Sequence, residues 1–292
     1  MHRIFWYSIG ISKLQKLTFI VVISLKLILM QNDLHIVGIQ TDLVWENAQQ
    51  NIAFIEEKIN TLATGVDLIV LPEMFTTGFT IHPEKVAEKM NGFSVLWMQK
   101  IAKEKQTAIC GSLVISDNNA FYNRLVFVHP SGRIETYNKR HSFTLVGEDK
   151  VYTAGSKKII IEYKGWKICP LICYDLRFPV WARNTENYDL LIFMANWPVA
   201  RVKAWNTLLN ARAIENMSYV IGVNITGKDA NDYVYSGNSL IIDYLGEEIS
   251  TLNKNEVGFV SATLNKDKQN TIRKKLGFLN DMDSFKIEFS KY

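Results

Sequence analysis

The segment "PLICYDLRFPVWARN" (residues 170–184) changes from apolar to charged residues in its middle. The apolar run "WKICPLIC", which ends at Cys173, is typical of a buried β-strand. Asp175 and Arg177 interrupt this pattern, and Pro179 suits the first turn of a helix, where its missing N–H is not needed. Cys173 is therefore predicted to lie where a strand ends and a helix begins. Three interpretations are open for it: a small buried residue, half of a metal or disulfide site, or a nucleophile.

The cysteines limit these interpretations. The chain has three, Cys110, Cys169 and Cys173, which is too few for a disulfide scaffold. On one strand Cys169 and Cys173 would stand roughly 13 Å apart, whereas a disulfide allows at most about 7 Å between Cα atoms. A metal pair is not indicated, because His141 is the only histidine near them and there is no second cysteine pair. We expect no metal and a reduced, cytoplasmic protein.

The composition indicates a globular protein with a neutral body. The chain has 292 residues, 48% of them hydrophobic, which is enough for one large or two ordinary domains. Its net charge of +4 is accounted for by Arg3, Lys13, Lys16 and Lys26, since residues 1–30 contain no acidic residue. A neutral body argues against nucleic acid as the main partner, because such proteins carry a basic surface.

Residues 1–30 differ in character from the rest of the chain. Their apolar stretch "LTFIVVISL" is interrupted at Lys26 and is shorter than the roughly 20 residues that a membrane-spanning helix needs. A basic start and a short apolar region resemble a signal peptide, but no A-x-A-like cleavage site follows. We interpret residues 1–30 as an extension outside the fold, with Met30 as the true start, and residues 31–292 as one domain. A membrane anchor is the alternative.

Strand-like and helical patterns alternate along this domain. The wholly apolar run "VDLIVL" is typical of a strand covered on both faces. Helices are predicted at residues 45–63, 84–105, 178–187, 203–216 and 265–277, and hairpins at residues 121–139 and 158–173. This alternation predicts a layered α/β domain, but a fold class alone does not predict a function.

Reactive groups in α/β sheets gather beyond the carboxyl ends of strands. Glu73 follows "VDLIVLP", Lys139 follows "RIETYN", Cys173 follows "WKICPLI", and Asn196 and Trp197 follow "LLIFMA". Alone, each of these is most often an ordinary structural or surface residue. Together, the first three are chemically coherent, because a neutral thiol needs a base or a nearby cation to become a thiolate. A carboxylate can take that proton, and an ammonium group can stabilise a developing oxyanion.

His141 is an alternative partner for the Cys173 thiol. It lies beyond the end of its predicted strand, and the sequence reveals no carboxylate that would orient its ring. The combination of carboxylate, amine and thiol is therefore the favoured hypothesis.

The segments "LPEMF", "NKRHSF…GED" and "PLICYDLRFP" resemble the three signature segments of the nitrilase superfamily, carbon–nitrogen hydrolases with a Glu–Lys–Cys triad. The resemblance extends in the right order over about residues 33–265. It implies that Glu73 is the general base, Lys139 the oxyanion-stabilising cation and Cys173 the nucleophile, with Glu148 as a second glutamate beside the lysine. It also implies a four-layer αββα sandwich and a homodimer formed across the helices that follow the nucleophile.

Within this superfamily, "CYDLRFPVWARN", "ANWP" and "NARAIEN" look most like the omega-amidase branch. Such enzymes hydrolyse the terminal amide of small 2-oxo acid amides such as 2-oxoglutaramate. The implied mechanism is acyl transfer through a cysteine thioester, with the backbone N–H of Tyr174 as a second oxyanion donor and no cofactor. The alternatives are another amidase branch, such as an N-carbamoyl amino acid hydrolase, and a non-catalytic scaffold, which has no physical need for all four residues.

A substrate that carries a carboxylate needs a cation in the pocket. Arg177, Arg201 and Lys203 are the candidates, with a structural ion pair as the alternative role for Arg177. Phe79 and Trp197 are expected to form part of the pocket wall. Glutamine is expected to be a poorer substrate than its 2-oxo analogue, because its ammonium group would need a buried anion that the sequence does not reveal.

Overall fold

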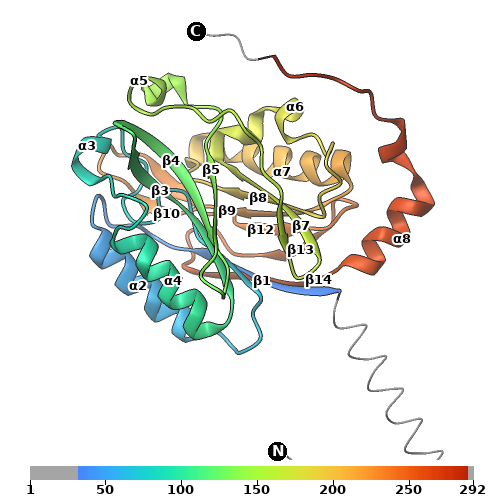
Figure 1. Cartoon of the computed structure of the whole chain (residues 1–292), viewed down its shortest axis with the longest axis horizontal. Helices are drawn as coiled ribbons and strands as arrows, with labels where there is room; N and C mark the ends of the chain where they lie inside the picture. Colours follow the sequence, from blue (N-terminus) through green and yellow to red (C-terminus); the bar gives the residue numbers. More distant parts are fainter. Residues whose placement is uncertain (1–31, 289–292) are drawn as a thin grey trace, which may run out of the picture.

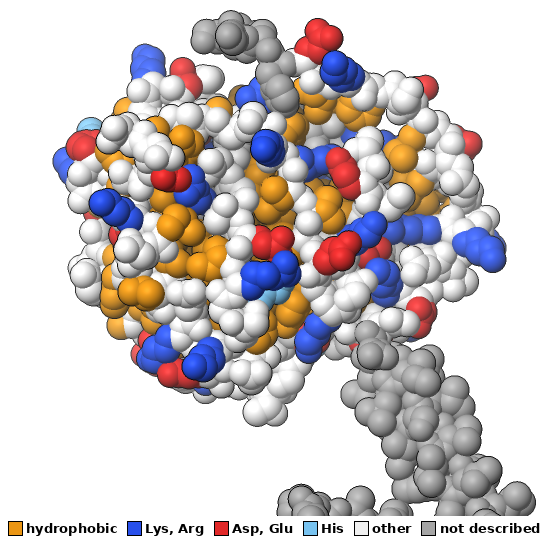
Figure 2. All heavy atoms as spheres, viewed as in Figure 1, with side chains coloured by type: hydrophobic (Ala, Val, Ile, Leu, Met, Phe, Trp, Pro, Cys, Tyr) orange, Lys and Arg blue, Asp and Glu red, His pale blue; other side chains and the backbone are white. Residues whose placement is uncertain are grey.

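The computed structural model describes residues 32–288 of the chain (Figure 1). The predicted extension, residues 1–30, lies outside the described residues, and its boundary stays a prediction. Within residues 32–288, no helix is both long enough and apolar enough to cross a membrane. Figure 2 shows basic and acidic side chains interspersed on the face in view.

A six-stranded mixed sheet forms one half of the fold (Figure 1). Its strands, in spatial order, are β14 (Gly258–Asn265), β1 (Asp33–Gln40), β2 (Leu68–Val70), β3 (Ala108–Asp117), β4 (Ala120–Val128) and β5 (Ile134–Asn138). The first three strands along the chain, β1, β2 and β3, are parallel, while β4 is antiparallel to both of its neighbours, β3 and β5. The carboxyl ends of β2, β3 and β5 therefore lie at the same edge of the sheet, together with the beginning of β4.

A second six-stranded sheet forms the other half. Its strands, in spatial order, are β13 (Glu248–Thr251), β12 (Leu240–Ile242), β9 (Tyr219–Val223), β8 (Leu190–Met194), β7 (Trp166–Ile172) and β6 (Ile161–Tyr163). The central strands β7, β8 and β9 are parallel and fully or almost fully apolar, because both faces of the sheet are covered. A separate hairpin pairs β10 (Thr226–Lys228) with β11 (Val234–Ser236).

The two sheets pack face to face, and helices cover their outer faces (Figure 1). Helices α2 (Ala48–Asn60) and α4 (Phe93–Lys105) pack their apolar residues against the first sheet. Helix α7 (Val202–Asn216) packs Trp205 and Leu209 against the second sheet. The layers therefore run helix, sheet, sheet, helix, and the predicted four-layer αββα sandwich is confirmed.

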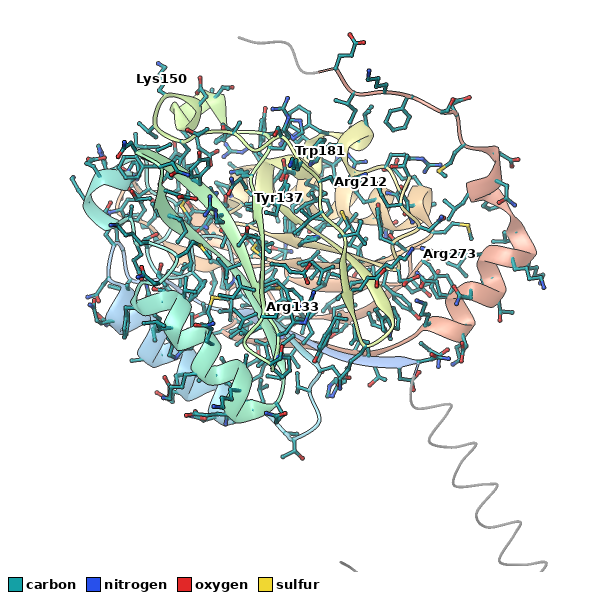
Figure 3. All side chains as sticks on the ribbon, viewed as in Figure 1. Arg133, Tyr137, Lys150, Trp181, Arg212 and Arg273 are labelled. Carbon is teal, nitrogen blue, oxygen red and sulfur yellow. The ribbon has the colours of Figure 1, made fainter. Side chains whose placement is uncertain are left out.

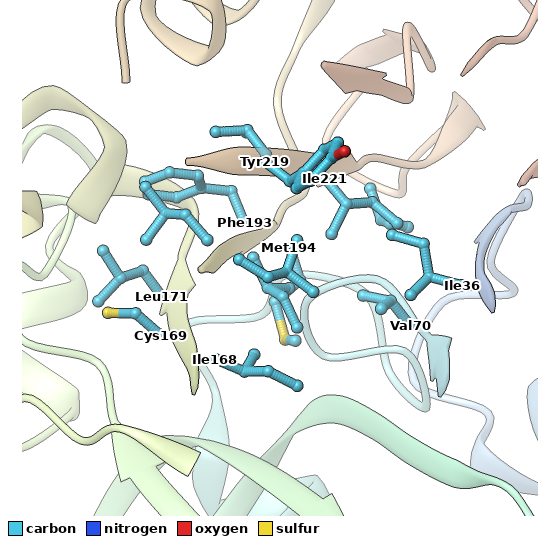
Figure 4. Packing of buried hydrophobic residues seen from close by; sticks show 14 of the residues in the cluster. Ile36, Val70, Ile168, Cys169, Leu171, Phe193, Met194, Tyr219 and Ile221 are labelled. Atoms are coloured by element: carbon cyan, nitrogen blue, oxygen red, sulfur yellow. The ribbon is translucent and has the colours of Figure 1, made fainter. Parts of the chain in front are cut away.

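The interior between the two sheets is one continuous apolar core (Figure 4). Ile36 and Val70 from the first sheet belong to the same buried cluster as Ile168, Met194 and Ile221 from the second. Burial of this kind is worth roughly 1.5–3 kcal/mol for each large side chain. The core holds the two sheets in a fixed relation, so the carboxyl ends of their strands present side chains to a common site.

The predicted helix at residues 84–105 is divided in the structure. A single turn, α3 (Pro83–Val86), is separated from α4 by an irregular segment in which Ala87 is extended. The carboxylate of Glu88 turns back and accepts a hydrogen bond from the backbone N–H of Ser94 in the first turn of α4. The acidic side chain therefore caps a new helix instead of continuing the first one.

The predicted helix at residues 178–187 is also shorter than expected. Only α6 (Pro179–Ala182) forms, because the buried carboxamide of Asn184 bonds to the backbone of Tyr188 and Asn216. By contrast, the predicted polar helix near the end of the chain is present as α8 (Lys266–Leu276). A buried asparagine competes with helical hydrogen bonding, and here tertiary contacts decide the outcome.

Candidate active site

Cys173 is the first residue of a 3₁₀ turn (Cys173–Arg177) that directly follows β7. Its φ angle is +44°, a left-handed conformation that is uncommon and strained for a residue other than glycine. The sharp turn leaves the Cys173 side chain half-buried, whereas Cys110 and Cys169 have no solvent exposure. Of the three thiols, Cys173 is the one that a molecule in the adjoining cavity can reach.

Lys139 directly follows β5 and forms the centre of a buried ion network. Its Nζ atom lies 2.9 Å from Glu73 Oε1, and 2.9 Å from each carboxylate oxygen of Glu148. Glu73 comes three residues after the end of β2, and Glu148 is the first residue of the short helix α5 (Glu148–Val151). Both glutamates are fully buried and Lys139 is almost so. The structure thus brings together residues that are 66 positions apart in the chain.

The two carboxylates keep Lys139 charged. Burial by itself would lower the pKa of Lys139, but Glu148 and Glu73 outweigh this effect and raise that pKa well above its usual value. Burial also raises the pKa of Glu148, although the Lys139 ammonium opposes the shift. The network therefore holds a permanent positive charge at a defined position in the protein interior.

The Cys173 thiol lies against the same network. Burial and the Glu73 carboxylate raise the pKa of this thiol well above its usual value, against the opposing effect of Lys139. The Cys173 thiol and the Lys139 ammonium line the same cavity. The resting site therefore contains a neutral thiol beside a base, an arrangement suited to proton transfer as the sulfur attacks a substrate.

Two asparagines hold Glu73 in place. Asn123 Nδ2 donates to Glu73 Oε1 at 2.8 Å, and the backbone N–H of Asn196 donates to Glu73 Oε2 at 2.9 Å. Sequence reasoning did not identify Asn123, which lies early in β4 rather than after a strand. Its signal is a buried polar residue near the beginning of an antiparallel strand, and that end of β4 lies at the same edge of the sheet as the site.

Asp175 is a buried organiser of the turn that carries Cys173. Its carboxylate accepts hydrogen bonds from Tyr137 Oη at 2.7 Å, His141 Nδ1 at 2.8 Å and the backbone N–H of Ile172 at 3.1 Å. Figure 3 shows Tyr137 beside Trp181, whose Nε1 atom donates to the Tyr137 hydroxyl at 3.0 Å. Asp175 therefore links the end of β7 to the segment around Lys139.

The expectation that no carboxylate orients His141 was wrong, because Asp175 does so. The ring of His141 is also stacked on Phe178, with 3.6 Å between ring centroids. His141 does not line the cavity at Cys173, whereas Lys139 does. The histidine thus belongs to the support of the turn, and Glu73 is the nearby carboxylate whose charge raises the pKa of the thiol.

A cavity of about 360 Å³ adjoins Cys173 and Lys139, and the predicted wall residue Phe79 lines it. The Phe79 ring lies under the Lys139 ammonium, with Nζ 5.4 Å from the ring centroid. A second, smaller cavity of about 30 Å³ also adjoins Cys173, and both Tyr174 and Trp197 line it.

Two guanidinium groups line the smaller cavity together with Cys173. Arg177 lies over the ring of Trp197, 4.9 Å from its centroid, and Arg201 lies over the ring of Phe143, 5.2 Å from its centroid. Among residues 32–288, Arg177 forms no ion pair, so the alternative of a structural ion pair is not observed there. Its guanidinium group instead stacks on the Trp197 ring. Lys203 is exposed and lines neither of these cavities.

The larger cavity also contains carboxylates that sequence reasoning did not find. Glu46 and Asp229 line it, which corrects the expectation of a pocket without an anion. Glu46 accepts a hydrogen bond from Thr80 Oγ1 at 2.7 Å, and Asp229 accepts one from Tyr235 Oη at 2.8 Å. Neither carboxylate lines the smaller cavity, where the charged groups are the two arginines.

In the part of the chain that the structure describes, no group of three or more His, Cys, Asp or Glu side chains is arranged to hold a metal ion. The site brings together a half-buried thiol, a buried ammonium group and two buried carboxylates.

A thiol, a buried lysine and two buried glutamates at the strand ends of an αββα sandwich define a class of hydrolase, and the comparisons agree. The chain belongs to the carbon–nitrogen hydrolase family, whose family model matches residues 35–274.

More specific likenesses lie within this family. The chain is 40% identical to the omega-amidase YafV of Escherichia coli strain B / BL21-DE3 over 255 residues, which cover 87% of this chain and 98% of that protein. It is 33% identical to the 2-oxoglutaramate amidase of Bacillus subtilis strain 168, over 84% of this chain and 95% of the relative. A crystal structure of a carbon–nitrogen hydrolase superfamily protein from Xanthomonas campestris, with an arsenic adduct in its active site, has a TM-score of 0.85. The two chains are 38% identical, and the match covers 88% of this chain and 99% of the Xanthomonas chain.

Proposed function

We propose that the protein is an omega-amidase that hydrolyses the terminal amide of small 2-oxo acid amides, of the 2-oxoglutaramate type, to the acid and ammonia. The observation that carries this proposal is that the Cys173 thiol and the buried Lys139 ammonium line one cavity, with Glu73 Oε1 2.9 Å from Lys139 Nζ. Identity of 40% to an omega-amidase over nearly the whole of that relative supports the choice of branch.

In this mechanism Glu73 accepts the proton of the Cys173 thiol as the sulfur attacks the amide carbon. The oxyanion forms between the Lys139 ammonium and the backbone N–H of Tyr174, the residue after the nucleophile. Glu73 then gives the proton to the departing nitrogen, the C–N bond breaks, and a thioester and ammonia result. Water activated by Glu73 hydrolyses the thioester. Acid–base help of this kind typically contributes about 10² to 10⁴-fold to the rate.

Glu148 acts through Lys139 in this scheme. Both of its carboxylate oxygens bond to Nζ, so it fixes the direction in which the ammonium group can meet an oxyanion. Glu148 does not line either cavity at Cys173, which supports a positioning role rather than contact with substrate.

The substrate carboxylate is proposed to bind Arg201, with Arg177 beside it. Arg201 lines both cavities at Cys173 and stacks on an aromatic ring, which orients its guanidinium group. A hydrogen-bonded contact to a charged group is worth about 1.5–3 kcal/mol.

Arg201→Met is therefore expected to lower kcat/KM for 2-oxoglutaramate by about 10 to 100-fold, mainly through KM. A neutral primary amide of similar length should lose much less, because it has no carboxylate to bind. Lys203→Met is the matched control, since Lys203 is exposed and lies outside both cavities. Equal losses for the charged and neutral amides would show that Arg201 only supports the fold of the site.

The proposed function is tested by ammonia release from 2-oxoglutaramate, glutamine and an N-carbamoyl amino acid. We expect kcat/KM for 2-oxoglutaramate to exceed that for glutamine by at least about tenfold, because a penalty of 1.36 kcal/mol already gives this factor. The charged side chains that line the smaller cavity at Cys173 are arginines, which repel an ammonium group, whereas Glu46 and Asp229 line the larger cavity. Preference for the N-carbamoyl compound would favour that branch, and turnover of none would favour a scaffold.

The same assay tests the start of the domain. A chain beginning at Met30 is expected to have the kcat/KM of the full chain, because the alternating strand and helix pattern of the sequence starts after Met30. Loss of activity on removing residues 1–29 would contradict that boundary.

We further propose a cytoplasmic homodimer formed through the helices after the nucleophile. Val180 in α6 and Ile214 in α7 are large apolar residues that are 54% and 52% exposed, which supports a buried contact there. All three cysteines are free, as expected in a reducing compartment. Sedimentation of the wild-type protein as a monomer at micromolar concentration would rule out the dimer.

A further inference from the structure

Asn196 has a buried polar atom that the mechanism above does not use. It lies two residues after β8, and its Nδ2 atom donates to the backbone carbonyl of Glu73 at 2.6 Å. Because a carbonyl oxygen can only accept, this contact determines which end of the carboxamide carries the nitrogen. The remaining atom, Asn196 Oδ1, is buried and has no hydrogen-bond partner.

An unpartnered oxygen at this position calls for a ligand. A buried acceptor without a donor costs about 1–3 kcal/mol, and native proteins rarely contain one without a reason. Asn196 is 6% exposed and lines both cavities at Cys173, so its free acceptor belongs to a residue of the reaction site.

The substrate has donors that need acceptors at this site. A primary amide presents one carbonyl oxygen, which Lys139 and the Tyr174 N–H are proposed to bind, and an NH₂ group with two hydrogens. Glu73 Oε1 already accepts from Lys139 and Asn123, and Oε2 from the backbone N–H of Asn196. Asn123 Oδ1 is also buried without a donor, but Asn123 lines neither cavity. The carboxamide oxygen of Asn196 is thus the unpaired acceptor that belongs to a cavity-lining residue.

We propose that Asn196 Oδ1 accepts a hydrogen bond from the NH₂ group of the substrate amide and then from the departing ammonia. The inference rests on the proposed function and adds the residue that selects amides. When the C–S bond has formed and Glu73 returns its proton to the nitrogen, that nitrogen becomes a stronger donor. The bond to Asn196 therefore strengthens as the C–N bond breaks, and an interaction of this kind raises the rate.

This contact distinguishes an amide from an ester of the same acid. The alkoxy oxygen of an ester has lone pairs and no hydrogen, so it leaves Asn196 Oδ1 unpaired and places two acceptors together. A site that recognises an N–H group discriminates strongly against an analogue that lacks it. Asn196 is thus a specificity-determining residue for the leaving group.

The test compares 2-oxoglutaramate with the corresponding terminal methyl ester in Asn196→Ala. We expect kcat/KM for the amide to fall by about 10 to 100-fold, and that for the ester by less than about threefold. The variant also loses the bond to the Glu73 carbonyl, but Glu73 serves both substrates. A change in the ratio of kcat/KM for the amide to kcat/KM for the ester therefore reports the loss of the acceptor Asn196 Oδ1.

Asn224→Ala is the matched control. The Asn224 side chain binds the backbone of Trp197, the residue next to Asn196. Its Oδ1 accepts from Trp197 N at 2.7 Å and its Nδ2 donates to Trp197 O at 3.0 Å. Asn224 lines neither cavity. Its loss should change both substrates alike. If Asn196→Ala does not fold, as judged by thermal unfolding, Asn196→Ser replaces it with the same expected direction. Equal losses for amide and ester would overturn the inference, whereas a wild-type protein that hydrolyses neither would overturn the proposed function instead.

Discussion

Cys173→Ala is expected to lower kcat for 2-oxoglutaramate by more than about 10⁴-fold, because without the sulfur no thioester can form. The fold should remain, since Cys173 is half-buried and its hydrogen-bonded turn is held by Asp175 rather than by the thiol. The measurements are ammonia release and thermal unfolding of the same preparation. A variant that retained more than a few per cent of the wild-type rate would exclude Cys173 as the nucleophile.

The matched controls are Cys110→Ala and Cys169→Ala. Both side chains are fully buried in the apolar core, so each change removes a sulfur atom from the interior and should lower Tm by a few degrees. Most activity should remain, because neither thiol lines the cavity at Lys139. A thiol-specific reagent should label Cys173 first. Faster labelling of Cys169, together with loss of activity in its alanine variant, would show that the wrong thiol was chosen.

Lys139→Met is expected to damage both activity and stability. Removing a stabiliser of the oxyanion typically costs about 10² to 10³-fold in kcat. The change also leaves Glu73 and Glu148 without the cation that both of them bind. Removing one partner of a buried ion pair costs about 3–5 kcal/mol, which corresponds to a decrease in Tm of roughly 10 °C for a domain of this size.

The stability loss should depend on pH. Burial raises the pKa of Glu148, and Lys139 is the group that opposes this shift. Without Lys139, the folded protein holds a proton on Glu148 at a pH where the unfolded chain has released it, so stability is lost as pH rises. The difference in Tm between wild type and Lys139→Met should therefore become smaller as the pH is lowered from about 8 to about 5.

Lys100→Met serves as the comparison for Lys139→Met. Lys100 also has a carboxylate partner, Glu56 Oε1 at 3.0 Å, but its side chain is half-exposed. An exposed ion pair contributes little to stability, so Tm should barely change. Similar effects of the two substitutions would mean that the network around Lys139 is not the buried structure described here.

The reactive residues were predictable because they lie next to strong local patterns. An apolar run followed at once by Cys173 marks a strand end, and Lys139 comes at the end of the predicted hairpin at residues 121–139. Strand ends share an edge in an α/β sheet. The structure does bring the Glu73, Lys139 and Cys173 side chains together. Their catalytic roles remain predictions, which the variants above test.

Local patterns were least reliable where a polar side chain chooses a tertiary partner. Glu88 caps α4 and divides the predicted helix at residues 84–105, and Asn184 ends α6 early. Asp175 proved to be the carboxylate that orients His141, although the two are 34 residues apart. Glu46 lies within the helix predicted at residues 45–63, but α2 begins only at Ala48, so Glu46 lines the cavity from the loop before it. Asp229 lines the cavity from the loop between β10 and β11.

The sequence by itself determined the α/β layering and the position of Cys173 at a strand end, because these follow from periodicity and from residue order along single strands. Its three signature segments carried the resemblance to the family. Only the tertiary structure decided which groups surround that thiol. The contact of Asn196 with Glu73 spans 123 residues and depends on how two separate sheets pack. Such contacts are specified by the combined burial of both sheets, and no local segment contains the information that places them.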